Sequence, residues 1–140
     1  MNLDAKDKKI IEALKKDSRS TVRDIAKQTG IRPSTVHQRI GKLKKDGVIE
    51  KFTVKLNNKA VGENFIVFMF VSTKTDLAPS FFNNRSIKEV FGVTGEYDLL
   101  LKLKFRDVDE FNKFVISLRK NKAIAKTITS LATITLKEEI

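Results

Sequence analysis

The segment STVHQRIGKLKK, residues 34–45, concentrates side chains that can bind a polyanion. At 100° per residue its apolar members fall on one side of a helix, and its amide, imidazole, guanidinium and ammonium groups occupy the rest. It contains no carboxylate, and the next acid along the chain is Asp46. A helix that faces only water has no reason to avoid acids, whereas a helix that faces phosphates does. The segment indicates a nucleic-acid interface; the competing interpretation is a solvated surface helix.

The side chains of this segment suggest two roles. His37 and Gln38 can hydrogen-bond base edges, and Arg39 and Lys42 can bind phosphate or guanine. The first turn of the helix can offer hydroxyl and backbone N–H groups to phosphate. We expect the following residues to contact DNA: Thr21, Arg32, Ser34, Thr35, His37, Gln38, Arg39, Lys42 and Lys45.

Two further helices must position this one. The first follows Asp4 and the second follows Thr21, each with an aspartate three residues on, as in a capping box. Gly30 can take the positive φ that ends the second helix, and Pro33 with Ser34 begins the third. The pattern of small residue, turn glycine and apolar plug across residues 25–36 is typical of a helix-turn-helix. A helical hairpin without a nucleic-acid role can also produce it.

The distribution of charge agrees with a polyanion partner. The net charge is +11, and residues 1–60 hold 16 Lys and Arg against 7 Asp and Glu, a net +9, whereas residues 61–140 hold 12 against 10, a net +2. A surface that binds a polyanion needs clustered bases, and general solubility does not. The alternative is a lysine-rich surface of the kind found in thermophiles.

The hydrophobic period changes from helical to two after Gly47. We expect a helix-turn-helix domain at 1–47, a strand-bearing hinge at 48–61 and a second domain at 62–140. The second domain reads as strand 63–74, helix 78–85, strands 87–94 and 97–105, helix 108–120 and strand 126–137. This βαββαβ order predicts an α+β chain whose second domain is ferredoxin-like, with both helices on one face of the sheet.

The strand sequence FIVFMFV, residues 65–71, is apolar on both faces. It is about a third of the roughly 20 residues that a membrane-spanning helix needs, so it predicts a buried strand. A sheet that is apolar on both faces needs a cover for the face that lacks helices. The simplest cover is the sheet of a second copy, so we expect a homodimer.

Several function classes lack the residues they require. The chain has no cysteine and one histidine, which exclude disulfides, thiolate sites and multi-histidine metal sites, so no cofactor, metal or catalytic residue is expected. An enzyme on the second domain is disfavoured, and Asp107 and Asp109 are better explained as a helix cap and first-turn charges. The N-terminus lacks the apolar stretch of a signal peptide, so we expect a cytoplasmic protein without a membrane partner.

Residues 3–52, LDAKDKKIIEALKKDSRSTVRDIAKQTGIRPSTVHQRIGKLKKDGVIEKF, resemble the DNA-binding segment of the Lrp/AsnC, or feast/famine, family. VTGEYDLLLKLKF, residues 93–105, resembles the core motif of the ligand-sensing (RAM) domain of that family. The resemblance implies a sequence-specific transcription regulator that binds double-stranded DNA and works with the transcription machinery. The alternative is a sequence-tolerant architectural DNA-binding protein.

The resemblance also implies assembly and an effector. Family members form dimers whose sheets pack together, often assemble to tetramers or octamers, and in many cases bind an amino acid or a related small molecule between dimers. Without the resemblance, residues 94–98 would read as an ordinary hairpin corner. Carried onto this chain, the effector site would include Thr94, Gly95, Glu96, Tyr97, Asp98, Thr129, Ser130 and Thr133.

Overall fold

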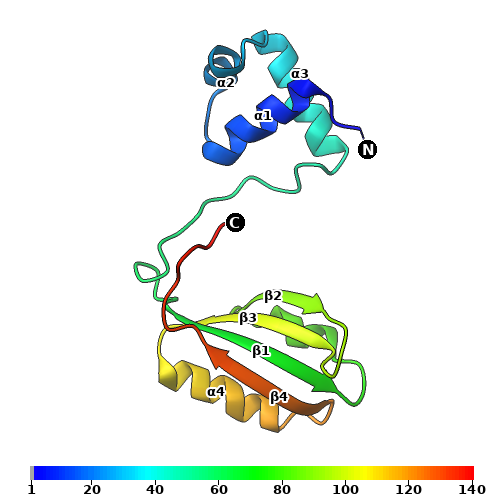
Figure 1. Ribbon diagram of the computed structural model, residues 1–140, viewed down its shortest axis with the longest axis vertical. Helices are drawn as coiled ribbons and strands as arrows, with labels where there is room; N and C mark the ends of the chain where they lie inside the picture. Colours follow the sequence, from blue (N-terminus) through cyan, green and yellow to red (C-terminus); the bar gives the residue numbers. More distant parts are fainter. Residues whose placement is uncertain (1) are drawn as a thin grey trace. The chain divides into compact units, whose positions relative to one another are not determined.

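The computed structural model describes residues 2–140 and divides them into two compact units (Figure 1). The boundary falls between Lys55 and Leu56, within the segment expected as a hinge. The chain is α+β, as predicted from the change of hydrophobic period. No helix in residues 2–140 is long and apolar enough to cross a membrane.

The first unit contains the helices α1 (Ala5–Lys16), α2 (Val22–Thr29) and α3 (Pro33–Lys45). The capping boxes predicted at Asp4 and Thr21 are both present, and Gly30 ends α2 at φ 72°. The helices enclose a small apolar core in which no member is more than 8% exposed. Its buried members are Ile10, Ala13, Ile25, Ile31, Val36 and Leu43.

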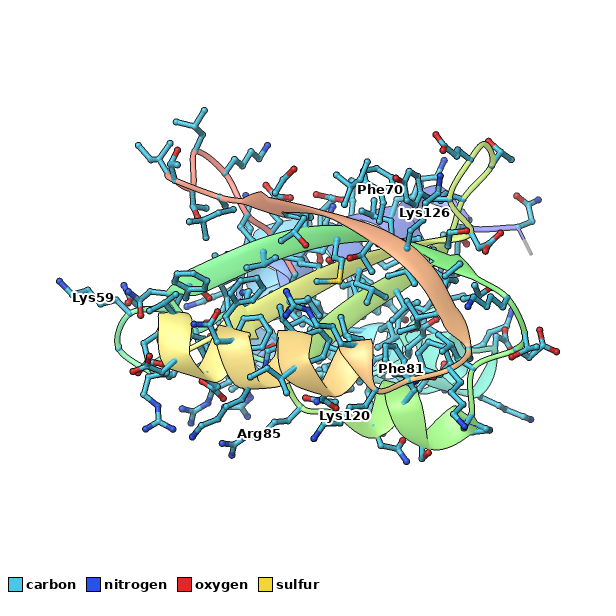
Figure 2. All side chains as sticks on the ribbon, turned by 90° about the horizontal axis from the view of Figure 1, so that it is seen from below. Lys59, Phe70, Phe81, Arg85, Lys120 and Lys126 are labelled. Carbon is cyan, nitrogen blue, oxygen red and sulfur yellow. The ribbon has the colours of Figure 1, made fainter. Side chains whose placement is uncertain are left out.

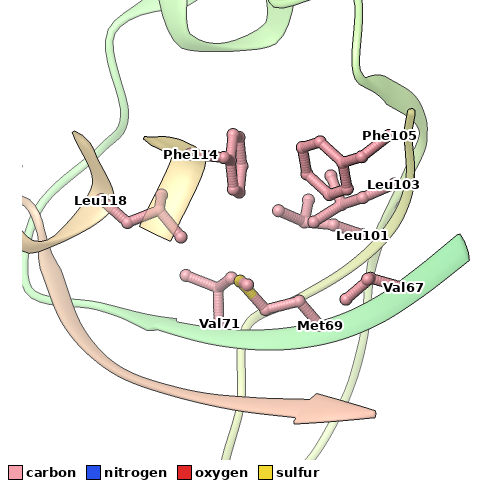
Figure 3. Close-up of a cluster of buried hydrophobic side chains, with 8 residues drawn as sticks. All are labelled: Val67, Met69, Val71, Leu101, Leu103, Phe105, Phe114 and Leu118. Atoms are coloured by element: carbon pink, nitrogen blue, oxygen red, sulfur yellow. The ribbon is translucent and has the colours of Figure 1, made fainter. Parts of the chain in front are cut away.

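The second unit contains the predicted βαββαβ order. Its elements are β1 (Phe65–Thr73), the 3₁₀ helix η1 (Pro79–Asn83), β2 (Ile87–Gly92), β3 (Leu99–Phe105), α4 (Val108–Arg119) and β4 (Ile124–Leu131). The four strands form an antiparallel sheet in the order β2-β3-β1-β4. Figure 3 shows the core, in which Phe114 and Leu118 of α4 pack on inward side chains of β1 and β3 such as Met69 and Leu101.

The prediction of a strand within residues 48–61 is wrong, because residues 50–56 form neither a helix nor a strand. Apolar and polar residues alternate in this segment, as they do in a strand with one face on an apolar surface. A strand also needs a neighbouring backbone with which to form hydrogen bonds. The apolar side chains of this pattern are exposed: Phe52 by 47%, Val54 by 63% and Leu56 by 53%.

The helix between β1 and β2 and the last strand are both shorter than predicted. The helix expected at 78–85 is only the 3₁₀ helix η1, which Pro79 begins and the Asn83-Asn84 pair ends. The last strand stops at Leu131 rather than at residue 137. Among residues 2–140 it pairs with β1 alone, and this pairing ends near the first residue of β1, where the Ala132 N–H donates to the Ile66 carbonyl.

Candidate nucleic-acid interface and effector loop

Helix α3 exposes the polar side and buries the apolar side that the sequence predicts. Val36 and Leu43 are buried in the core of the first unit, while Gly41 is exposed among the polar positions. Of the residues expected to contact DNA, Thr35 and Arg39 are half-buried. The exposed ones are Thr21, Arg32, Ser34, His37, Gln38, Lys42 and Lys45.

The first turn of α3 differs from that of the other helices. Arg32 is its N-cap and makes no side-chain capping bond, whereas the N-cap side chains of α1, α2 and α4 each accept a backbone N–H. Ser34 lies inside the helix and is not its cap, because Pro33 already occupies the first helical position. The uncapped N–H groups and the absence of first-turn acids leave this end attractive to an anion.

Arg39 is held by α1 rather than presented to solvent. Its Nη1 donates to the Asp4 carboxylate and lies 3.1 Å from Oδ1 of Asp7. The Arg39 hydrogen bond lowers the pKa of the Asp4 carboxyl to about 2. The pair joins the start of α1 to the middle of α3, which orients α3. Nothing local in the sequence marks this contact, since Asp4 and Arg39 are 35 residues apart.

Thr21 has a structural role in the same unit. Its hydroxyl accepts the Asp24 N–H at 3.1 Å, and the Asp24 carboxylate accepts the Thr21 N–H at 3.3 Å. The residue remains exposed at the start of α2. Thr21 therefore fixes the beginning of the helix that packs against α3.

The loop 94–98 closes the hairpin between β2 and β3. Gly95 takes φ 108°, which a residue with a side chain rarely adopts. The Asp98 carboxylate accepts the Thr73 N–H at 2.6 Å and the Thr73 hydroxyl at 2.9 Å. Both hydrogen bonds lower the pKa of Asp98, and the bond from the Thr73 backbone N–H contributes most. Asp98 thus holds the loop against the end of β1.

A charged and aromatic cluster covers one side of this loop. Lys126 of β4 pairs with Glu96, and its Nζ lies 5.2 Å from the ring centroid of Tyr97. The Tyr97 ring lies 5.8 Å from that of Phe70; Figure 2 labels Phe70 and Lys126 at the same end of the sheet. Lys126 was not among the residues expected at this site, although the antiparallel order already requires β4 to start beside the end of β1.

The residues expected on the last strand lie away from the loop. Ser130 pairs with Phe68 and Thr129 with Met69, so the two point to opposite faces of the sheet. Ser130 is four residues beyond Lys126, or roughly 13 Å along the strand. Thr133 follows the end of β4. Within one chain, the structure therefore gathers Thr94, Gly95, Glu96, Tyr97 and Asp98 but not these three residues.

Comparison with known proteins covers both units. A family model described as winged helix-turn-helix DNA-binding matches residues 3–50, and the Lrp/AsnC ligand binding domain matches residues 68–140. HTH-type transcriptional regulators named FL11 are 39% identical in Pyrococcus furiosus, over 81% of this chain and 78% of that protein, and 34% identical in Pyrococcus abyssi, over 99% and 94%.

The chain belongs to the Lrp/AsnC family. As an Lrp/AsnC protein it is a helix-turn-helix transcriptional regulator with a ligand-binding domain. The Lrp/AsnC fold extends over the whole chain. AsnC from E. coli matches with a TM-score of 0.88 and 25% identity over 100% of this chain and 98% of AsnC. A Neisseria meningitidis regulator in complex with L-Met matches with a TM-score of 0.92 and 24% identity over 99% and 94%.

Proposed function

We propose that this Lrp/AsnC regulator binds a specific DNA sequence as a homodimer, with α3 of each copy in the major groove. The observation that supports the proposal best is the exposed, acid-free face of α3, which begins at an uncapped N-terminus and ends in Lys42, Lys44 and Lys45. The major groove admits a helix of this size, and phosphates on its walls attract exposed bases.

The proposed roles differ along α3. His37 and Gln38 read base edges, because both are exposed and can donate and accept hydrogen bonds. Lys42 and Lys45 bind phosphate, and Ser34, Thr35 and the first-turn N–H groups bind a second phosphate. Arg32 precedes that turn and adds a charge there. Arg39 acts indirectly, since its guanidinium is engaged by Asp4 and Asp7.

Selection of sites from a random DNA pool tests this proposal. A palindromic consensus is the expected result, because a two-fold dimer reads two half-sites. A pool that returns no consensus would contradict sequence-specific regulation and favour the architectural alternative, for which the +9 charge of residues 1–60 would suffice.

Two substitutions test the division of roles. Gln38→Ala should relax base preference and cost about 1 to 3 kcal/mol on the best site. Lys42→Ala should weaken binding to all sequences and lower the slope of log K against log salt by about one. Lys120→Ala, an exposed lysine after α4, is the control and should change neither quantity. Identical behaviour of the Gln38 and Lys42 variants would contradict the assignment of base reader and phosphate binder.

The proposed dimer uses the sheet face opposite α4. Ile128, Phe70, Leu100 and Phe91 pair in register across all four strands and so form one apolar row on this face. Phe70 is 38% exposed, Ile128 50% and Phe91 54%. A contiguous apolar row on an open sheet marks an interaction surface, and a second copy of the same face is its simplest cover. Tetramers or octamers would be assemblies of such dimers.

We also propose that an amino acid or a related small molecule regulates the protein through the 94–98 loop. The Neisseria meningitidis neighbour was crystallised with L-Met. The loop and the adjacent strand β4 offer charged groups of both signs, Glu96 on the loop and Lys126 on β4. Calorimetric titration with each of the twenty amino acids tests this. Binding that is lost in Gly95→Val is expected, since the bulky side chain opposes φ 108°. Full retention of binding in that variant would place the effector elsewhere.

We infer that the chain works in the cytoplasm and acts by binding rather than by catalysis. Its relatives are transcriptional regulators, and DNA is the partner that its basic half fits. Turnover of a small molecule that is specifically lost on Asp98→Asn would overturn this inference.

A further inference from the structure

A cavity of about 320 Å³ lies in the second unit, where β2 begins, β3 ends and α4 starts. It is separate from the effector loop, because the seven residues of β3 lie between them, a distance of roughly 20 Å. The 61–62 turn closes one side of it. Its polar lining consists of Glu63, Arg85, Ser86, Lys104, Arg106 and Glu110.

Three of the charged groups around this cavity already have partners. Glu63 pairs with Lys88, and the Glu110 carboxylate accepts the Arg106 backbone N–H at 2.7 Å. Lys104 Nζ lies 3.0 Å from Glu138 and donates to Asn58 at 2.8 Å. The ion pairs balance the charges of Glu63 and Lys104, whereas Glu110 is hydrogen-bonded to a neutral N–H group and keeps its negative charge.

Two arginine side chains and one hydroxyl group around the cavity have no partner within residues 2–140. Neither the Arg85 nor the Arg106 guanidinium forms an ion pair or a hydrogen bond with any of residues 2–140. Ser86 is 7% exposed, and among residues 2–140 no other polar residue is buried. Its backbone N–H and carbonyl are bonded to Asn84 and Lys104, but its hydroxyl has no partner within residues 2–140. Arg85 lies on the side of the sheet that carries α4 (Figure 2).

We propose that this cavity binds the phosphate group of a small phosphorylated molecule. Two guanidinium groups supply planar pairs of donors that match phosphate oxygens, and together they balance a dianion. The Ser86 hydroxyl adds a donor from within the lining. The volume is at the lower end of the range for small-ligand pockets. This inference does not depend on the DNA-binding proposal, and its failure would leave that proposal untouched.

Calorimetric titration of the full chain with inorganic phosphate and with pyrophosphate, at constant chloride, tests the site. Replacing both arginines, Arg85→Gln with Arg106→Gln, should weaken binding about tenfold or more. Ser86→Ala should weaken it by a smaller factor. The control pair, Arg119→Gln with Lys120→Gln, removes the same charge from the exposed end of α4 and should leave binding unchanged.

Glu110→Gln should strengthen phosphate binding, whereas the arginine substitutions should weaken it. It removes a negative charge from the lining while its side-chain oxygen can still accept the Arg106 N–H, so phosphate should bind more tightly. Circular dichroism of each variant shows whether the fold is retained. Equal weakening by the two double variants, or weaker binding in Glu110→Gln, would overturn the proposal.

A competition experiment separates a small phosphorylated ligand from the DNA backbone. Phosphate-induced shifts of the Arg85 and Arg106 side-chain NMR signals should persist when duplex DNA is added. If duplex DNA alone produces those shifts and phosphate does not, the two arginines belong to a DNA-binding surface, and the small-ligand assignment is wrong.

Discussion

Asp4 and Arg39 show how one pair of residues connects stability with recognition. The Arg39 hydrogen bond lowers the pKa of Asp4 to about 2, below the ordinary value near 3.8. A depressed carboxyl pKa means that the folded state favours the charged form, so the pair stabilises the fold at neutral pH. That stabilisation is lost as the pH falls through the interval between about 4 and about 2.

Asp4→Asn should therefore lower the unfolding temperature of the first unit at neutral pH. The difference from the unsubstituted protein should shrink between about pH 4 and about pH 2, because the carboxylate becomes protonated there. Amide NMR signals of α1 and α3 followed during heating provide the measurement. Glu12→Gln is the control: its partner Lys15 is exposed, and such pairs contribute little. A pH-independent effect of Asp4→Asn would show that the ion pair is not its cause.

Arg39→Gln should weaken binding to every DNA sequence and also lower the unfolding temperature, because it releases α3 from α1. Lys42→Ala should weaken binding without the loss of stability, since Lys42 is exposed in α3. Comparing DNA affinity with unfolding temperature for the two variants separates a positioning residue from a contact residue. A stable Arg39→Gln protein with weak DNA binding would make Arg39 a direct contact instead.

At the scale of elements, the sheet has two apolar faces, and within residues 56–139 helix α4 covers one of them. Met69 and Leu101 lie beneath α4, whereas Phe70 and Leu100, one residue away on the same strands, face the open side. The register makes this alternation unavoidable, because successive residues of a strand point to opposite faces. In the proposed dimer, the sheet of the second copy would cover this open face.

Phe70→Lys should dissociate the proposed dimer. The substitution places a charge in the middle of the apolar row, and we expect the dissociation constant to rise by at least about 100-fold. Analytical ultracentrifugation over a concentration series measures it. Ile116→Lys on α4 is the matched control, since Ile116 is 52% exposed but lies on the other layer. Dissociation in the Ile116 variant and not in the Phe70 variant would assign the interface to α4.

At the scale of the whole molecule, the uneven charge predicts a strong dependence of DNA binding on salt. With roughly 6 to 10 phosphate contacts per dimer, log K should fall by about 0.9 per contact for each tenfold increase in salt. If phosphate contacts cause the salt dependence, the slope of log K against log salt should be almost the same for operator and random DNA. The affinity at any one salt concentration should still be higher for the operator. Filter binding or fluorescence anisotropy at several salt concentrations measures both. A slope near zero would contradict an electrostatic interface.

The sequence by itself determined the features that depend on neighbouring residues. Caps at Asp4, Thr21 and Asp107, the stop at Gly30 and the periods of the apolar residues are all local, and each is present in the structure. The order of strands and helices followed from these periods. The basic face of α3 was readable for the same reason, since a helix with known apolar positions has known exposed ones.

Only the tertiary structure decided which distant residues meet. The Asp4–Arg39 pair, the Glu96–Lys126 pair and the arginines of the cavity each join segments that no local pattern connects. It also decided where strands end, because β4 stops where β1 no longer offers a backbone partner, and residues 50–56 have no strand partner at all. Local propensity acts over a few residues, whereas pairing, burial and charge compensation depend on neighbours that only the folded chain supplies.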